Sequence, residues 1–369
     1  MIRFCFVGKK KERIALFSLD LELTKSCNLN CKYCFESEKK QQYIDFEEVI
    51  ARIDCAKDRA KALKQNVINI DFTGGEPLLA FNLIKSIVEY CNGTEDYKFQ
   101  YGIVTNGTLF TDKIASFCGL HDVAINLSLD GNKSSHDKNR INKNGDGSYS
   151  VIMGNLKNFI DYPAPVVANM VITMENVKDF YEDFLHIYRL GFKRIRSVLD
   201  ISHKWNSEEL RVLEEQFLQC ADYYYMQNKD GQKIYWNFAE DGIERILNPR
   251  KEYFCKNGID SFLADVDGNL HNCSICEEDE FSIIGTVEEG INEEKIKQWR
   301  TYKRQLKEKC LDCKMQTFCA QCDCVFLNKK ITGDYYCVPE HYCVLTHIQY
   351  SLCEKMIDKV RQYKNYRRC

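Results

Sequence analysis

Three cysteines in one short segment have the spacing of a metal centre. Cys27, Cys31 and Cys34 lie within eight residues in the pattern C-x3-C-x2-C. A loop this tight can aim three thiolates at one small inorganic centre, and it leaves one coordination position without a protein ligand. An open position distinguishes a reactive metal site from a structural one. The segment therefore predicts a reactive centre. The alternatives are a zinc knuckle or buried free thiols, although no fourth Cys or His follows nearby.

With the aromatic residue Phe35 after it, this spacing resembles the signature of the radical S-adenosylmethionine (SAM) enzymes. The resemblance implies that the three thiolates bind three irons of a [4Fe-4S] cluster and that SAM chelates the fourth. It also implies that the reduced cluster cleaves SAM to methionine and a 5′-deoxyadenosyl radical. That radical takes a hydrogen atom from an unactivated C–H bond, while the protein binds, orients and excludes water and oxygen.

A second motif, Thr73-Gly-Gly-Glu-Pro77, ends a predicted strand. Paired glycines allow a close approach of the backbone to a ligand, and Glu76 places a carboxylate at a strand terminus, where α/β proteins bind ligands. The alternative is an ordinary turn. By resemblance to the family's GGEP motif, Gly74, Gly75, Glu76 and Pro77 contact the methionyl ammonium of SAM.

A third region runs from Ser128 to Arg140 and contains Ser128-Leu-Asp-Gly131 and His136-Asp-Lys-Asn-Arg140. It resembles the family's S-x-D-G…H-D-x-x-R region. The resemblance implies that Ser128 and Arg140 lie near the SAM carboxylate and that Asp130 lies near the ligand. The alternative is that Ser128 and Asp130 are local caps at a strand end.

The cysteines are concentrated near the C-terminus, where eleven of 20 lie between Cys255 and Cys353. Their pattern, C-x12-G-x4-C followed by C-x2-C-x5-C, resembles the SPASM extension of radical SAM peptide-modifying enzymes, which binds two auxiliary [4Fe-4S] clusters. A zinc ribbon is the alternative. The resemblance implies an outer cluster on Cys310, Cys313, Cys319 and either Cys337 or Cys343. It implies an inner cluster on Cys255, Cys273 and either Cys322 or Cys324, with Cys276 as an extra candidate. Three [4Fe-4S] clusters are therefore expected in total.

The elements that must position these motifs alternate between strand and helix. Alternation in residues 2–7 and 14–24 predicts an N-terminal hairpin, and Asp45 with Glu48 predicts a capped helix start. Regular alternation of strands and helices implies a parallel sheet with right-handed crossovers. The predicted strands are 15–24, 67–73, 98–104, 123–129, 166–172 and 193–199, and the helices after the first are 80–92, 111–118, 149–161, 177–190 and 207–228.

The predicted strands carry polar side chains on one face, such as Asp20 with Glu22, Asn69 with Asp71, and Asn126. Fully covered parallel strands are apolar on both faces, and dry burial of so many polar groups is costly. The polar faces are therefore expected to line an interior that holds a polar ligand and water. Six units are too few for an eight-strand barrel. The fold that the resemblance implies is an α/β fold: a (β/α)6 partial TIM barrel with a C-terminal Cys-rich SPASM auxiliary-cluster domain.

Length and composition limit the remaining possibilities. The chain has 369 residues and a net charge of −3 at pH 7. The charge argues against a dominant nucleic-acid surface, and no apolar run approaches the roughly 18 residues of a membrane span. The first residues have too short an apolar run for a signal peptide. Clustered Cys in such a chain indicate metal ligands in a reducing compartment, here the cytoplasm.

The expected domains are an N-terminal hairpin strand (1–14), a radical SAM partial barrel (15–235), a SPASM domain (250–345) and a C-terminal helix (346–369). The function implied is that of a maturase which oxidatively modifies a ribosomally synthesised precursor peptide, by a thioether or carbon–carbon crosslink. Its electron donor is expected to resemble flavodoxin or ferredoxin. Sulfatase maturation ranks lower, because relatives of that kind carry Asp where this chain has Ser274. A non-catalytic iron–sulfur or zinc scaffold is a further alternative.

Overall fold

The structure is a computed structural model, and two compact units interleave along its chain. Unit 1 comprises Met1–Ser128, Arg140–Val166 and Lys256–Tyr302, and unit 2 comprises Leu129–Asn139, Val167–Cys255 and Lys303–Cys369. The predicted N-terminal hairpin strand, Phe35, Cys276 and Cys322 lie outside the described residues. The described residues are 16–34, 39–200, 203–249, 255, 257–275, 279–302, 310, 312–319 and 324–366.

Unit 1 is built on one sheet in which β1 holds a central place. The strand order is β11-β10-β9-β8-β1-β2-β3-β4. Strands β8, β1, β2, β3 and β4 run parallel, while β9, β10 and β11 continue the sheet in antiparallel pairs. The strands are β1 (Phe17–Glu22), β2 (Val67–Thr73), β3 (Lys98–Thr105), β4 (Ala124–Ser128), β8 (Ser261–Ala264), β9 (Asn269–His271), β10 (Ile283–Thr286) and β11 (Gly290–Ile291).

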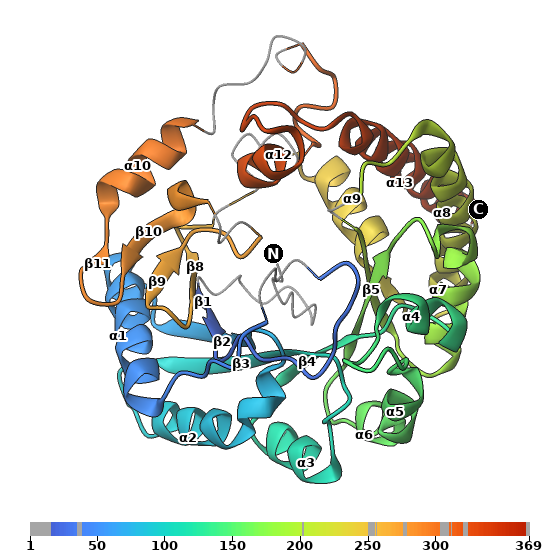
Figure 1. Ribbon diagram of the computed structural model, residues 1–369. Coiled ribbons are helices and arrows are strands. Elements are labelled where there is room, and N and C mark those ends of the chain that lie inside the picture. The colour runs from blue at the N-terminus through green and yellow to red at the C-terminus, as the bar shows by residue number, and fades with distance from the viewer. Residues whose placement is uncertain are drawn as a thin grey trace. The chain divides into compact units, whose positions relative to one another are not determined.

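Helices cover the apolar face of this sheet (Figure 1). Phe17, Leu19 and Leu21 alternate along β1 and are fully buried, because successive strand residues point to opposite faces. The helix α1 packs against β1 and β2, and α2 against β3. The helices of unit 1 are α1 (Phe46–Ala62), α2 (Phe81–Asn92), α3 (Asp112–Leu120), α5 (Tyr149–Gly154), α6 (Leu156–Ile160) and α10 (Glu293–Tyr302).

A buried arginine on α1, Arg52, links this helix to the turn after β8. Arg52 is 3% exposed. Its guanidinium donates to the backbone carbonyls of Asp265 (2.9 Å) and Val266 (3.0 Å). A buried guanidinium needs acceptors for its fixed donors, so α1 and the β8–β9 turn stabilise each other.

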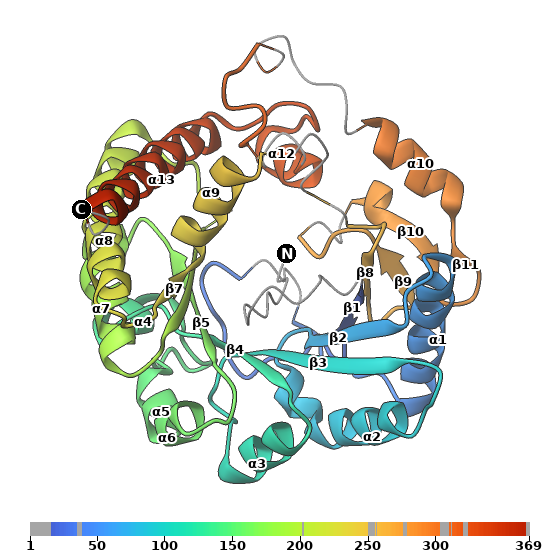
Figure 2. The same ribbon diagram turned by 180° about the vertical axis from the view of Figure 1, so that it is seen from behind.

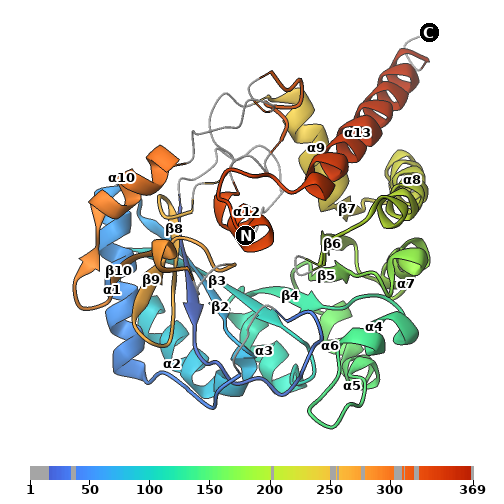
Figure 3. The ribbon, with the colours of Figure 1, turned by 45° about the horizontal axis from the view of Figure 1, so that its top comes forward.

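Unit 2 contains three parallel strands and a group of aromatic side chains. The indole of Trp236 is fully buried and its ring centroid lies 5.1–5.5 Å from those of Phe184, Phe217 and Phe238. The helix α13 packs along α8 and α9 (Figures 2 and 3). The strands are β5 (Val167–Ile172), β6 (Arg194–Leu199) and β7 (Tyr235–Trp236). The helices are α4 (Lys133–Asn139), α7 (Phe180–Arg189), α8 (Ser207–Lys229), α9 (Asn237–Leu247), α12 (Val325–Thr332) and α13 (Glu340–Tyr366).

The predicted α/β fold with six strand–helix units is confirmed, with bounds that agree to within a few residues. The capping box of Asp45 and Glu48 at the start of α1 is confirmed as well. The predicted helix 149–161 is divided into α5 and α6. Helix α4, strand β7 and helix α9 were not predicted. In the described part of the chain, no helix is long and apolar enough to cross a membrane.

Candidate functional site

The cysteine loop follows β1 and is held by contacts with three other segments. The backbone N–H of Asn30 donates to the carbonyl of Ile141 (2.6 Å). The ammonium of Lys39 donates to the carbonyl of Leu29 (2.8 Å), and the amide of Asn28 donates to the hydroxyl of Thr108 (2.8 Å). Cys27 is buried, whereas Cys31 and Cys34 are partly exposed. Contacts with these segments therefore fix the loop, which presents two of its three thiols.

Cys27 lies in an environment that suits a metal-bound thiolate. The N–H of Leu29 donates to the Cys27 sulfur (3.4 Å), and the Asn106 amide approaches it at 4.0 Å. Burial raises the pKa of the Cys27 thiol to about 11, and metal coordination is what deprotonates such a thiol. Among the described residues, no three His, Cys, Asp or Glu side chains enclose a single metal ion. Ligands of a cluster bind different irons and stand further apart, so three thiols with an open fourth position fit a [4Fe-4S] cluster.

Gly74 and Gly75 bring the second motif against the cysteine loop. A Cβ atom on Gly74 would lie 2.3 Å from the carbonyl oxygen of Thr24, and one on Gly75 would lie 2.3 Å from that of Ser26. The N–H of Gly75 donates to Thr24 (2.8 Å) and the N–H of Glu76 donates to Ser26 (2.9 Å). The close approach that these glycines permit is therefore to the chain's own backbone, directly before Cys27.

Glu76 connects the ends of β2 and β3. Its carboxylate accepts from the Thr105 hydroxyl (2.8 Å) and from the backbone N–H groups of Asn106 (2.7 Å) and Leu78 (3.2 Å). The side chain is 1% exposed, and burial raises its pKa to about 7. Pro77 begins the short 3₁₀ helix Pro77–Ala80. The Asn106 side chain extends the connection by donating to the Asn28 amide oxygen (2.9 Å).

The remaining predicted SAM contacts divide between the units. Ser128 ends β4 in unit 1 and is partly exposed. Arg140, 7% exposed, lies with its guanidinium carbon 5.2 Å from the ring centroid of Tyr33, inside the cysteine loop. The structure thus brings Arg140, the glycine pair and Glu76 to the loop that carries Cys27. Asp130 belongs to unit 2, is fully buried and accepts from the N–H of Val171 (2.9 Å).

A buried carboxylate in unit 2 shapes the segment that contains Asp130. Asp183 on α7 is 1% exposed and accepts from the backbone N–H (2.9 Å) and the amide (2.7 Å) of Asn132. Gly131 has φ +132°, and a Cβ there would lie 2.3 Å from the Asp183 carboxyl. Only glycine adopts this backbone region readily. Burial raises the pKa of Asp183 to about 7.

Buried polar atoms on the interior face of unit 1 fit a polar ligand. Asp71 is 2% exposed and Asn126 is 1% exposed. Within the described residues, Asp71 Oδ1 and Asn126 Nδ2 have no hydrogen-bond partner. Native proteins rarely leave such groups unsatisfied without a ligand, ion or water. The prediction of a polar interior therefore has two unsatisfied side chains in its favour.

The C-terminal cysteines lie in both units, and the alternative ligand sets of the auxiliary clusters stay open. Within the described part of the chain, none of them forms a disulfide. Cys310 and Cys319 are buried, and Cys313 lies between them in a run of turns. The partly exposed candidates are Cys255, Cys313, Cys324, Cys337 and Cys343 in unit 2 and Cys273 in unit 1. The choice between Cys322 and Cys324, like the role of Cys276, falls on residues that include undescribed ones.

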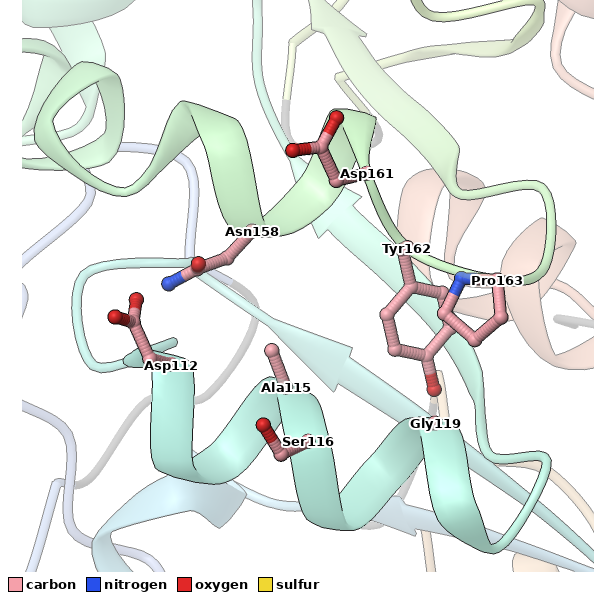
Figure 4. Close-up of a pocket in the computed structure, with 8 residues that line it drawn as sticks. All are labelled: Asp112, Ala115, Ser116, Gly119, Asn158, Asp161, Tyr162 and Pro163. Atoms are coloured by element: carbon pink, nitrogen blue, oxygen red, sulfur yellow. The ribbon is translucent and has the colours of Figure 1, made fainter.

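A surface hollow in unit 1 lies away from these motifs (Figure 4). Its volume is about 360 Å³. It lies between α3, which contributes Asp112 and Ser116, and the segment Asn158–Pro163. The Tyr162 hydroxyl at its edge donates to the carbonyl of Val123 (2.6 Å). None of the predicted site residues lines it, so we assign it no part in the chemistry.

Three side chains of the site were not singled out from the sequence. Asn28 and Asn106 bind each other beside Cys27, and Asp183 fixes the turn at Asn132. The Thr105-Asn-Gly-Thr108 turn at the end of β3 was the only signal for Asn106. No local pattern marks Asp183, since it lies more than fifty residues beyond the turn that it binds.

Comparisons with known proteins agree with this geometry. A family model described as the radical SAM superfamily matches residues 21–187. An uncharacterised protein of Methanocaldococcus jannaschii is 30% identical over 78% of this chain and 95% of its own length. A cysteine-type anaerobic sulfatase-maturating enzyme of Clostridium novyi is 25% identical over 72% of this chain and 74% of its own. The sporulation killing factor maturation protein SkfB of Bacillus subtilis is 26% identical over 70% and 60%.

Two solved structures have a similar fold. Native anSMEcpe with bound AdoMet and the Cp18Cys peptide has a TM-score of 0.81 at 18% identity, over 94% of this chain and 99% of that one. SuiB of Streptococcus suis bound to precursor peptide SuiA has a TM-score of 0.63 at 16% identity, over 89% and 76%. These matches agree with the cysteine loop and with the glycine–glutamate motif that lies against it. The chain belongs to the radical SAM superfamily, whose enzymes use SAM and a [4Fe-4S] cluster.

Proposed function

We propose that this enzyme is a cytoplasmic maturase that oxidatively modifies a ribosomally synthesised peptide by forming a thioether or a carbon–carbon crosslink. The observation that carries the proposal is the assembly of the Cys27–Cys34 loop, Glu76 and Arg140 at one edge of the unit 1 sheet. The names of SkfB, a maturation protein, and of SuiB with its precursor peptide support a peptide substrate.

In this proposal each group of residues has a separate task. The thiolates of Cys27, Cys31 and Cys34 hold the SAM-binding cluster. Gly74 to Pro77, Ser128, Asp130 and Arg140 bind SAM. When bound, the cluster and SAM supply the radical that takes a hydrogen atom from the peptide. Arg140 suits a SAM carboxylate, because a guanidinium offers two parallel donors to a carboxylate.

The C-terminal cysteines are proposed to hold two auxiliary [4Fe-4S] clusters, which accept the electron released by the peptide. The proposed ligands of the outer cluster are Cys310, Cys313, Cys319 and either Cys337 or Cys343. The proposed ligands of the inner cluster are Cys255, Cys273 and either Cys322 or Cys324, with Cys276 as an extra ligand. Flavodoxin or ferredoxin is proposed as the electron donor to the enzyme.

The test is an anaerobic assay of the reconstituted enzyme with SAM, dithionite and the short peptides encoded beside the gene. We expect 5′-deoxyadenosine and a peptide lighter by one pair of hydrogen atoms. The matched control replaces Cys27, Cys31 and Cys34 with Ala, which keeps the auxiliary cysteines and should abolish both products. Absence of 5′-deoxyadenosine from the wild-type enzyme would refute the proposal.

Sulfatase maturation is the second candidate, because the Clostridium novyi relative bears that name. Here Ser274 stands beside Cys273, in the position where relatives of that kind carry Asp, and a hydroxyl is a far weaker base than a carboxylate. A sulfatase-derived cysteine peptide tests this candidate in the same assay. An aldehyde trapped by a hydrazide reagent would favour sulfatase maturation over crosslinking.

A further inference from the structure

Two aspartates face each other on the polar side of the unit 1 sheet. Asp20 on β1 and Asp71 on β2 are register partners on neighbouring parallel strands. Their side chains therefore leave the sheet on the same side, about 4.8 Å apart at the backbone. Asp71 is 2% exposed and Asp20 is partly exposed. Two carboxylates this close cannot both ionise without strong repulsion.

Small residues occupy the positions beside Asp71 on the next two strands, in the row of register partners that crosses the sheet. Gly102 on β3 is the register partner of Asp71, and Ala124 on β4 is the partner of Gly102. On the β3 side of the pair this row therefore carries no large side chain, whereas on the β8 side the register partner of Asp20 is Leu263. The Asn69 amide donates to Asp71 Oδ2 (2.7 Å), whereas Asp71 Oδ1 has no partner among the described residues. Asn126, in the next row, likewise leaves its amide nitrogen unsatisfied. These features suit a surface that could contact a polar ligand.

Among the described residues, the charges around the pair do not neutralise it. Burial raises the pKa of Asp20 to about 6. The pKa of Asp71 is raised well above its ordinary value by burial and by the charge of Asp20. Glu22 follows Asp20 on the same face of β1, and beyond β8 the Asp265 carboxylate binds His271 (2.8 Å). Lys98 begins β3 on this face, exposed and four residues before Gly102.

These strands also carry the radical SAM motifs at their carboxyl ends. Cys27 follows Asp20 by seven residues and Glu76 follows Asp71 by five. The strands that carry the pair therefore lead directly into the two motifs.

We propose that Asp20 and Asp71 share one proton and that Asp20 accepts the proton released when the peptide substrate is oxidised. The inference rests on the proposed function. After a hydrogen atom has left a peptide carbon, that carbon bonds to a thiol sulfur or to a second carbon. The S–H or C–H bond at the new position breaks, one electron passes to an iron–sulfur cluster, and one proton passes to the Asp20 carboxylate.

Burial assigns the two roles. Asp71 is more buried and next to another carboxylate, so it keeps the shared proton. Asp20 is more exposed and ionises first, which leaves a base with a pKa close to the working pH. Pairs of acids with different environments commonly have different pKa values, so that one acid holds a proton while the other acts as a base.

The first test measures the shared proton directly in the holoenzyme. Infrared spectra of protein labelled with ¹³C-aspartate should show a protonated carboxyl at neutral pH that Asp71→Asn removes. The matched control, Asp112→Asn on the exposed start of α3, should retain it. If Asp71→Asn retained every protonated-aspartate band of the wild type at neutral pH, the inference would be overturned, whatever the enzyme does to peptides.

The second test uses the peptide that the wild-type enzyme modifies. Asp20→Asn should still form 5′-deoxyadenosine to within about twofold, which shows an intact fold and cofactor site, while modified peptide falls about 10²-fold. Asp20→Glu should restore part of it, and the wild-type rate should rise with pH through about 6. Full peptide modification by Asp20→Asn would overturn the role. A shared proton without any peptide modification would instead refute the proposed function and the accepting role together.

Discussion

The Gly75→Ala substitution tests how the two motifs of the site are joined. Gly75 has no positive φ, so alanine is compatible with its backbone conformation. The added Cβ would lie 2.3 Å from the Ser26 oxygen, 2.6 Å from the Ser26 carbonyl carbon and 3.0 Å from the Lys25 oxygen. All three are backbone atoms, so no side chain can rotate to relieve the contact. The motif and the cysteine loop must therefore separate.

The size of the effect follows from these contacts. Ordinary van der Waals contact begins at 3.4 Å, so relief from 2.3 Å requires a movement of about 1 Å. That movement breaks the hydrogen bonds from Gly75 to Thr24 and from Glu76 to Ser26. Each lost bond costs about 1 kcal/mol and overpacking costs about 1–3 kcal/mol. We expect the free energy of unfolding to fall by about 3–5 kcal/mol.

Urea unfolding of the anaerobic protein, followed by circular dichroism, measures this change, and iron analysis reports the fate of the cysteine loop. The matched control is Gly93→Ala, where the nearest atom to the new Cβ is 3.4 Å away and φ is −82°. It should change stability by no more than about 0.5 kcal/mol and keep its iron. If Gly75→Ala matched this control in stability and iron content, the loops would not be joined as described.

Three further outcomes are expected. Gly131→Ala should lose about 3 kcal/mol more stability than Gly145→Ala, because Gly145 also has a positive φ (+89°, against +132° for Gly131) but no atom within 4 Å of its new Cβ. Equal losses in urea unfolding would show that the Asp183 contact is unimportant. Because burial raises the pKa of Asp183 to about 7, its stabilising contribution is complete below its unfolded pKa and is lost as the pH rises through about 7. Unfolding between pH of about 5.5 and 7.5 should therefore show a decline on the order of 2 kcal/mol, which Asp183→Asn lacks. Replacing Cys27, Cys31 and Cys34 with Ala should remove about four of about twelve irons and abolish SAM cleavage. A complete loss of iron, measured against sulfide content, would contradict the presence of separate clusters.

Local patterns were sufficient to predict most of the secondary structure. The alternation of Leu19 and Leu21 with Asp20 and Glu22 is the signal of a half-polar strand, and β1 has that form. The Asp45–Glu48 capping box lies entirely within one turn of chain, so the sequence contains all of it. Helix α4 was missed because seven residues are too few to show an apolar period.

Long-range pairing could not be predicted in the same way. The sequence did not indicate that β8 pairs with β1. Register between distant strands depends on which faces are buried together, and many apolar segments satisfy that condition. The partners of Glu76 on Thr105 and Asn106 escaped prediction for the same reason, since hydrogen bonds between loops leave no period in the sequence.

The place of β1 between β2 and β8 affects how the protein is made. Arg52 finds its acceptor at Asp265, which lies 213 residues later in the chain. At about 5–20 residues per second on the ribosome, that interval lasts roughly 10–40 s. During this time β1 has an open edge that invites pairing with other chains, and the thiols of the neighbouring loop stand beside an incomplete sheet. We therefore expect pairing at the open edge and oxidation of these thiols to be most frequent during this interval of synthesis.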